Sequence, residues 1–184
     1  MVSLVKAKLR LALKERVRGL SRKERAEKSH RIQKALFRRK FFKNARVILF
    51  YASLPSEVDT WPMMRQALKR HKRVLVPFMR KGRIVPSEVK DLKADLGRGP
   101  YGIFEPRGRS FRPVKLSDVD LVIVPGIGFD RRGFRLGRGG GHYDRFLCKL
   151  RGHVPLVGLA FKAQRIQRIP VARHDISVDE VLYA

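Results

Sequence analysis

The sequence predicts an α/β fold built on a mainly parallel sheet. Three observations lead to this class: strand-like and helical stretches alternate along the chain, the strand-like stretches are continuous apolar runs, and the composition is globular. The 184 residues are 43% hydrophobic, which excludes a disordered chain. This length suits one domain over residues 1–184, because no linker in the chain is long enough to divide it.

The first forty residues predict two helices. Apolar side chains recur there at helical spacing, with Lys and Arg on the opposite face: Val5, Leu9, Ala12, Leu13, Val17 and Leu20. Ser21 followed by Glu24 is a capping box, so a second helix should run from about Arg22 to Arg39. The basic, amphipathic N-terminus is similar to an organellar transit peptide, but its apolar stripe continues into the capped helix, which favours a folded segment.

From residue 46 the apolar pattern becomes that of buried strands. Strands are expected at 46–51, 73–77, 119–124, 154–161 and 178–183. Thr60 and Pro62 should open a helix that ends near Arg70. The region 78–117 is expected to be irregular, with a short strand around Ile84 and a short helix around Leu92. A long glycine-rich loop over 126–141 and a helix over 143–150 complete the prediction.

Charge is the most unusual property of the chain. Lys and Arg number 43 and Asp and Glu 16, so the net charge is +27, which indicates anionic partners. No stretch approaches the roughly 20 apolar residues of a membrane span, so no membrane partner is expected. The single cysteine, Cys148, excludes an internal disulfide and a cysteine-rich zinc site, and it favours a cytoplasmic location.

The strongest chemical signal is PGIGFDRRGFRLGRGGGHYDRFL, over residues 125–147. It runs from the end of a predicted strand into a predicted helix, where parallel sheets bind ligands. Its glycines allow close backbone approach, the helix N-terminus offers N–H groups, and Arg135 and Arg138 are bidentate phosphate donors. Asp144 is suited to hold a metal beside phosphates. A phosphate cradle is therefore predicted; a flexible glycine loop and an RNA-binding Arg/Gly segment stay open as alternatives.

This stretch resembles the signature of the 5-formyltetrahydrofolate cyclo-ligase family, P-G-[IVL]-[GA]-F-D followed by R-[LIVM]-G-x-G-x-G-[YH]-Y-D. Further segments resemble the family in the same order: K-x-x-L-R at 6–10, SLPSEVDT at 53–60, YGIFEP at 101–106 and DISVDEVLY at 175–183. The resemblance implies ATP- and Mg²⁺-dependent closure of 5-formyltetrahydrofolate to 5,10-methenyltetrahydrofolate, with release of ADP and phosphate. It also implies a three-layer α/β/α sandwich, and we expect a monomer.

The resemblance implies a role for each matching residue. The implied ATP contacts are Lys6, Arg10, Arg135, Leu136, Gly137, Arg138, Gly139, Gly140, Gly141, His142 and Tyr143. The implied folate contacts, for a substrate with or without a polyglutamate tail, are Ala52, Glu57, Tyr101, Gly139, Gly140, Gly141 and His142. Arg138 and Tyr143 are implied to be catalytic, and Asp144 and Asp175 to be the Mg²⁺ ligands.

Several of these residues also have a plain structural interpretation. Lys6 and Arg10 lie four apart on one helix face, where they are either phosphate contacts or solvated charge. Glu57 is either a folate contact or a carboxylate at a helix start. Tyr101 could be an ordinary loop aromatic, and Asp175 could pair with an arginine. His142 stands where tyrosine is more familiar, which puts in doubt any role for a phenol at that position.

Two other function classes compete with the cyclo-ligase. A nucleic-acid-binding protein would use the net charge and the arginines at 109–112 and 131–138, but the chain lacks a known nucleic-acid-binding motif. Non-specific affinity for RNA or DNA is still expected from the charge alone. A different enzyme on a similar sheet, such as a phosphosugar isomerase, would leave the ordered folate-type segments unexplained.

Overall fold

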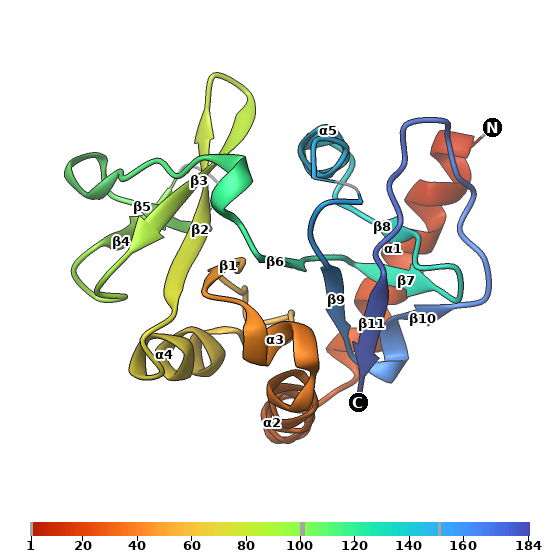
Figure 1. Ribbon diagram of the computed structural model, residues 1–184. Coiled ribbons are helices and arrows are strands. Elements are labelled where there is room, and N and C mark those ends of the chain that lie inside the picture. The colour runs from red at the N-terminus through yellow and green to blue at the C-terminus, as the bar shows by residue number, and fades with distance from the viewer. Residues whose placement is uncertain (1, 100–101, 151) are drawn as a thin grey trace.

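A computed structural model describes residues 2–99, 102–150 and 152–184. Its central sheet has the strand order β11-β9-β6-β1-β2-β3 (Figure 1). The strands are β1 Val47–Leu49, β2 Arg73–Arg80, β3 Arg83–Val89, β6 Leu121–Val124, β9 Leu156–Ala160 and β11 Glu180–Tyr183. Every neighbouring pair is parallel except β2 and β3, which form an antiparallel hairpin. The predicted mainly parallel sheet is confirmed.

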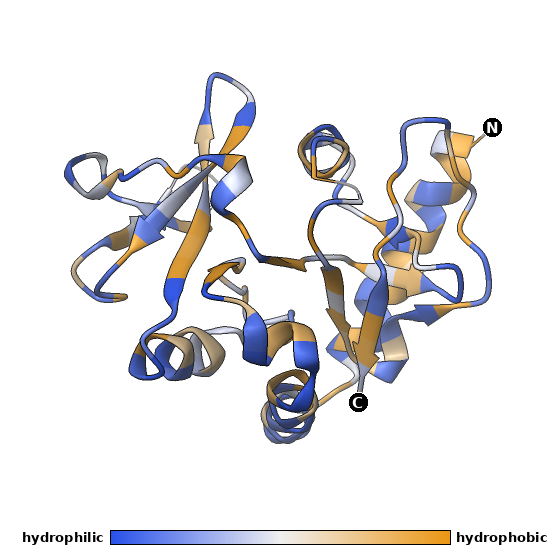
Figure 2. Cartoon of the chain, viewed as in Figure 1, coloured by the Kyte–Doolittle hydropathy of each residue, from blue (hydrophilic) through white to orange (hydrophobic). Residues whose placement is uncertain are grey.

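Helices cover both faces of this sheet, so its strands are apolar throughout. In β1 and just after it, Ile48 and Phe50 pack with α2, α3 and α4, whereas Val47 and Leu49 pack with α5. The helices are α2 Arg22–Arg38, α3 Lys40–Asn44, α4 Trp61–Lys69 and α5 His142–Leu147. Figure 2 shows the apolar colour along β2 and β6. Successive side chains of a strand point to opposite faces of the sheet, so an unbroken apolar run makes both faces apolar. Helices must then cover both faces, which produces three layers.

Helix α1, Val2–Arg18, lies outside these layers and packs on a second, three-stranded sheet (Figure 1). This sheet consists of β7 Gly128–Asp130, β8 Arg135–Leu136 and β10 Arg165–Ile166. Leu13 of α1 contacts β7 so closely that a Cβ on Gly128 would lie 2.5 Å from it. Leu13 and Val17 of the predicted apolar stripe are buried, but Val5 is 42% exposed.

The predicted starts of the helices agree with the structure better than the predicted ends. The Ser21–Glu24 capping box is present in both directions and begins α2. The helix ends at Arg38, one residue before the predicted end, and α3 follows at once. Three short 3-10 helices, Gly108–Ser110, Leu116–Asp118 and Lys162–Gln164, were not predicted.

Two predicted irregular regions turn out to be ordered hairpins. Residues 126–141 are not a continuous loop, because β7 and β8 pair and the buried Asp130 carboxylate accepts the N–H groups of Arg132 and Phe134 at the turn. Within 78–117, β2 pairs with β3, and β4 Leu96–Arg98 pairs with β5 Phe104–Pro106. Each pair joins neighbouring segments through a short connection, and the strands are short and carry Gly, Pro and charged residues, so their apolar pattern is weak.

The short helix predicted around Leu92 is wrong, because the chain forms a turn there. The Asp91 carboxylate accepts the N–H groups of Lys93 and Ala94, and the Asp95 carboxylate accepts those of Lys90 and Asp91. These side-chain bonds replace the helical backbone bonds that would otherwise form. Strand β4 then begins at Leu96, which leaves no length for a helix.

The order of the strands locates a ligand crevice. β1 has β2 and β3 on one side and β6, β9 and β11 on the other, so the chain first extends the sheet in one direction from β1 and later in the opposite direction. Ligands of open parallel sheets bind beyond the carboxyl ends of the strands at such a point. The segments that emerge there are residues 50–60 after β1 and 125–142 after β6. Within the described ranges, none of the helices has the length and apolar character that crossing a bilayer demands.

Candidate active site

The segment after β1 fixes Glu57 at the crevice. The Thr60 hydroxyl donates to the carbonyl of Tyr51 (2.5 Å) and accepts the N–H of Ser53 (3.2 Å), which folds the segment back on itself. Glu57 Oε2 accepts the N–H of Leu54 at 2.9 Å, so one carboxylate oxygen is held by the backbone. Ala52, also an expected folate contact, lies in the same segment and is buried.

The glycines at 139 and 141 are required by backbone conformation. Gly139 has φ +109° and Gly141 has φ +63°, in the left-handed region that side chains disfavour. Gly141 is the N-cap of α5, and no side chain caps this helix. A Cβ on Gly140 would lie 2.8 Å from the His142 ring. The loop thus presents backbone rather than side chains to the crevice.

Helix α1 brings two cations to this loop, although it is distant in sequence. Arg10 Nε donates to the carbonyl of Gly137 at 2.8 Å. Lys6 Nζ lies 2.6 Å from Asp175 Oδ2, and both side chains are largely buried. These contacts exclude the interpretation of Lys6 and Arg10 as solvated charge. The i, i+4 spacing on one helix face therefore directs both side chains to the same site.

Arg135 is a buried cation whose donors are incompletely used. Its side chain is 4% exposed, and Nη2 lies 2.9 Å from Asp144 Oδ1. The two groups are close in distance but not aligned, so Nε and Nη2 have no hydrogen-bond partner among the described residues. Burial lowers the pKa of Arg135 and the nearby Asp144 opposes that shift; a guanidinium stays charged throughout. Unused donors on a buried guanidinium suit an anionic ligand.

The two predicted metal ligands lie close together. Asp144 Oδ1 accepts the N–H of Ile176 at 3.3 Å, and Ile176 directly follows Asp175. Burial raises the pKa of Asp175, but hydrogen bonds from Lys6 and from the N–H of Ala172 outweigh this and hold the pKa below its usual value. Asp175 thus pairs with a lysine rather than with the arginine that we considered. Asp144 lies in the first turn of α5 without capping it.

The number of carboxylates limits the kind of metal that fits. The part of the chain that the structure describes contains no group of three or more His, Cys, Asp or Glu side chains that could hold a metal ion. Asp144 and Asp175 therefore supply two carboxylates at most. Mg²⁺ is commonly bound by one or two carboxylates while phosphates and water complete its shell, so the two residues fit Mg²⁺ beside a nucleotide.

Arg138 and Tyr143 lie on either side of the glycine loop. Arg138 Nη2 donates to Glu57 Oε1 at 2.9 Å, and the Arg138 side chain is 55% exposed, which leaves it free to contact a ligand. The guanidinium of Arg135 lies 5.4 Å from the centre of the Tyr143 ring. Burial raises the pKa of Tyr143 far above neutrality despite the nearby Arg135, so the phenol keeps its proton.

His142 connects the loop to a residue that the sequence did not indicate. Its Nδ1 lies 3.1 Å from the carbonyl of Gly82, at the tip of the β2–β3 hairpin, and 2.9 Å from Arg145 Nη2. One nitrogen cannot donate to the carbonyl and accept from Arg145 at once. Arg145 also donates to the carbonyl of Gly140 at 3.2 Å. The only sequence feature that indicated Arg145 as a site residue was its position in α5 beside the glycine loop. No local feature of the sequence indicated that Gly82 would contact His142.

Two of the expected site residues are not seen at the site. The Leu136 side chain is 1% exposed and packs with Leu13 and Ile169, so it faces the interior rather than a nucleotide. It alternates with Arg135 in β8, and only one of two successive side chains can face the crevice. Tyr101 lies outside the described residues. The pairing of β7 with β8 and the burial of Leu136 make residues 128–136 an ordered hairpin, which argues against a flexible loop over that part of the segment.

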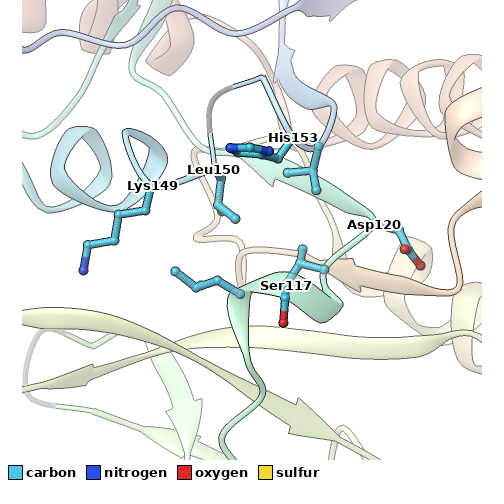
Figure 3. Close-up of a pocket in the computed structure, with 8 residues that line it drawn as sticks. Ser117, Asp120, Lys149, Leu150 and His153 are labelled. Atoms are coloured by element: carbon cyan, nitrogen blue, oxygen red, sulfur yellow. The ribbon is translucent and has the colours of Figure 1, made fainter.

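A pocket also lies elsewhere on the described part of the chain (Figure 3). It has a volume of about 550 Å³, and Ser117, Lys149, Leu150 and His153 help to line it. These residues lie at the amino ends of β6 and β9, at the opposite end of α5 from Gly141. Asp120 at its edge already accepts the N–H groups of Arg46 and Val47. The charged loop at the carboxyl ends, rather than this pocket, is the candidate site.

Known proteins share this architecture and sequence. A profile of the 5-formyltetrahydrofolate cyclo-ligase family matches residues 2–184. The mouse (Mus musculus) 5-formyltetrahydrofolate cyclo-ligase is 34% identical over 99% of this chain and 95% of its own. An NMR structure of Aquifex aeolicus 5,10-methenyltetrahydrofolate synthetase is 34% identical, has a TM-score of 0.85 and covers 97% of this chain and 89% of its own. The Mycoplasma pneumoniae 5,10-methenyltetrahydrofolate synthetase shares the fold at 19% identity, with a TM-score of 0.77, over 96% of this chain and 97% of its own. The chain therefore belongs to the 5-formyltetrahydrofolate cyclo-ligase family.

Proposed function

We propose that this chain closes 5-formyltetrahydrofolate to 5,10-methenyltetrahydrofolate at the expense of ATP, through phosphorylation of the formyl oxygen. The formamide oxygen is a poor leaving group. Transfer of the γ-phosphoryl group breaks its bond to ADP and forms a bond to that oxygen. The N10 amine then attacks the formyl carbon, loses its proton and expels phosphate. The observation that carries the proposal is the convergence of four cations and three carboxylates on one glycine loop.

The phosphates of ATP are assigned to Lys6, Arg10 and Arg135. The incompletely bonded guanidinium of Arg135 supports this assignment, because its Nε and Nη2 gain partners when an anion binds. Arg10 steadies the loop through Gly137, and Lys6 stands beside Asp175. The glycines let phosphate oxygens approach the backbone N–H groups at the start of α5.

Asp144 and Asp175 are assigned to hold Mg²⁺. A carboxylate beside a phosphate cradle is repelled by the phosphates unless a cation lies between them. Mg²⁺, when bound, neutralises charge on the phosphate oxygens during transfer. Lys6 forms an ion pair with Asp175 and Arg135 forms one with Asp144, so each of the two carboxylates has a cation beside it.

Glu57 is assigned to the folate. Its Oε2 is fixed by the N–H of Leu54 and its Oε1 by Arg138, so the carboxylate is held at the crevice in one orientation. An oriented carboxylate accepts hydrogen bonds from the donor groups of a reduced pterin ring. Ala52 is assigned to the folate as well, as a small, buried residue of the same segment after β1.

Arg138 and Tyr143 are assigned to the reacting atoms. Arg138 belongs to the glycine loop assigned to the phosphates, and it donates a hydrogen bond to Glu57, which is assigned to the folate. A cation between the two substrates is suited to stabilise charge on the phosphoryl group during transfer. The Tyr143 phenol stays protonated and can donate a hydrogen bond to a developing oxyanion, but it cannot act as a base at neutral pH.

The test is the reaction of the purified protein with 5-formyltetrahydrofolate and MgATP. We expect absorbance of the methenyl product to rise only when ATP and Mg²⁺ are both present, with one phosphate released for each product formed. Arg138→Ala should reduce the rate strongly, and Lys8→Ala, a change of an exposed cation on α1, should leave it unchanged. Product formed without ATP, or no product at all, would refute the proposal.

A further inference from the structure

The C-terminal half of α2, all of α3 and all of α4 are rich in basic residues and contain no acidic ones. The sequence contains no Asp or Glu between Lys28 and Ser56, and α4 contains none. Exposed cations lie in the last five residues of α2, along α3, and at the end of α4 and its C-cap: Lys34, Arg38, Lys40, Lys43, Lys69 and Arg70. Figure 2 shows the hydrophilic colour along α2 and α3. We refer to these six side chains as the basic edge.

Contacts between the helices bring the six cations together. Phe37 of α2 stacks on Phe42 of α3, with ring centres 4.5 Å apart. The guanidinium of Arg70 lies over the Phe37 ring at 4.6 Å, which joins the end of α4 to the end of α2. Lys72 Nζ donates to the carbonyl of Lys43 at 3.0 Å and so joins α4 to α3. The basic edge is therefore one continuous surface.

The positive charge of the basic edge is not neutralised within the protein. No carboxylate of the described residues forms an ion pair with any of its six cations, whereas neighbouring Arg39 pairs with Glu180. Like charges at this density repel one another and reduce stability. An anionic partner with closely spaced charges would remove that repulsion.

The basic edge is distant from the active site. α3 leads directly into the start of β1, and the end of α4 leads into the start of β2. The amino ends of parallel strands share one edge of a sheet, and the glycine loop lies at the other. A partner on the basic edge would leave the crevice open.

From these observations we infer that the basic edge binds the phosphate backbone of a nucleic acid without regard to sequence. A nucleic acid presents closely spaced negative charges along its length, which matches a continuous row of exposed Lys and Arg. An acidic membrane surface fits less well, because binding to it requires apolar side chains as well as cations. The large exposed hydrophobic residues of the described chain lie on α1 and at Val171, and none lies on α2, α3 or α4.

The test compares two triple variants with the same loss of charge. The first, Lys34→Gln/Arg38→Gln/Lys69→Gln, removes half of the basic edge and keeps Arg70, which packs on Phe37. The control, Lys93→Gln/Arg109→Gln/Lys162→Gln, removes three exposed cations elsewhere. Fluorescence anisotropy measures binding to a short single-stranded RNA, to DNA of the same sequence, and to a scrambled RNA, over a series of salt concentrations. Circular dichroism and cyclo-ligase assays check the fold and the active site.

We expect the first variant to bind all three strands roughly tenfold or more weakly near 0.1 M salt, with a slope of log K against log[salt] reduced by about 2. The control should change affinity less than twofold, and cyclo-ligase activity should be unchanged in both. Because that activity is measured separately, the inference can fail while the proposed function stands. Equal weakening in both variants would show that binding follows net charge and would overturn the inference. Preserved RNA binding in the first variant, or binding to phosphatidylserine vesicles but to neither RNA nor DNA, would overturn it as well.

Discussion

Replacing Asp144 by Asn tests two roles of this residue at once: its ion pair with Arg135 and its assigned binding of Mg²⁺. The side chain keeps its size but loses its charge, and Arg135 loses the carboxylate 2.9 Å from its Nη2. Removal of one partner from a buried pair costs about 3–5 kcal/mol. Arg135 is 4% exposed but Asp144 is 16% exposed, so water compensates part of the loss and we expect about 3 kcal/mol. For a chain of this length that lowers Tm by about 6–12 °C.

The same substitution should change the dependence on Mg²⁺. One of the two carboxylates assigned to the metal becomes a neutral amide, so a higher free Mg²⁺ concentration is needed for half-maximal rate, and turnover falls strongly. The assay measures the rate of methenyl product formation against free Mg²⁺ at fixed ATP. A thermal melt without ligands measures the loss of stability separately.

Asp120→Asn is the matched control. Asp120 accepts the N–H groups of Arg46 and Val47 at 2.7 and 2.8 Å, at the edge of the sheet away from the glycine loop. We expect a loss of stability of about 1 kcal/mol and the parent's Mg²⁺ curve. If Asp144→Asn also lowers Tm but keeps the parent's Mg²⁺ curve, Asp144 only balances the charge of Arg135, and the assignment of the metal is wrong.

The other predictions concern the substrates and pH. Glu57→Gln should raise KM for the folate and lower kcat with little change in KM for ATP, because it loses a charge-assisted contact worth about 1.5–3 kcal/mol; steady-state kinetics with each substrate varied would detect this. Lys6→Ala and Arg138→Ala should weaken calorimetric binding of a non-hydrolysable ATP analogue, and Lys8→Ala should not; equal affinity in all three would remove α1 and the loop from the nucleotide site. The pKa of Asp175 is lowered in the folded chain, so its stabilising effect is complete above its unfolded pKa of about 4 and disappears as pH falls through the folded pKa. Asp175→Asn should therefore flatten the decline of Tm below about pH 4, and an unaltered acid limb would contradict the ion pair with Lys6.

Elements whose signals are local could be predicted from the sequence. The capping box begins α2 where Ser21 and Glu24 indicate, and the apolar runs at 46–51 and 119–124 contain β1 and β6. Where the prediction of a helix around Leu92 is wrong, nearby side chains compete for the backbone N–H groups. The turn at Leu92 replaces a helix because the carboxylates of Asp91 and Asp95 take the backbone N–H groups.

For the site, the sequence determined which residues could act, and the tertiary structure decided how they are combined. The glycines, the two arginines and Asp144 lie within one run of ten residues, 135–144, so the sequence indicates their chemistry directly. The contacts that complete the site join segments that are distant in sequence. Lys6 pairs with Asp175, Arg10 donates to the carbonyl of Gly137, and Arg138 pairs with Glu57. The periodicity of a single segment cannot predict these contacts, because the contacts of Lys6 and Arg10 depend on how α1 packs on the second sheet.

By itself, the sequence determined the fold class, the family signature, the candidate acids and bases, and the excess of positive charge. Only the tertiary structure decided that Leu136 faces the interior while Arg135 faces Asp144, and that Gly82 and Arg145 both contact His142. It also decided that the unpaired cations of α2, α3 and α4 gather at the edge of the sheet away from the glycine loop. The physical reason is the same in each case: propensity, capping and charge are properties of neighbouring residues, but burial and pairing depend on which distant surfaces pack together.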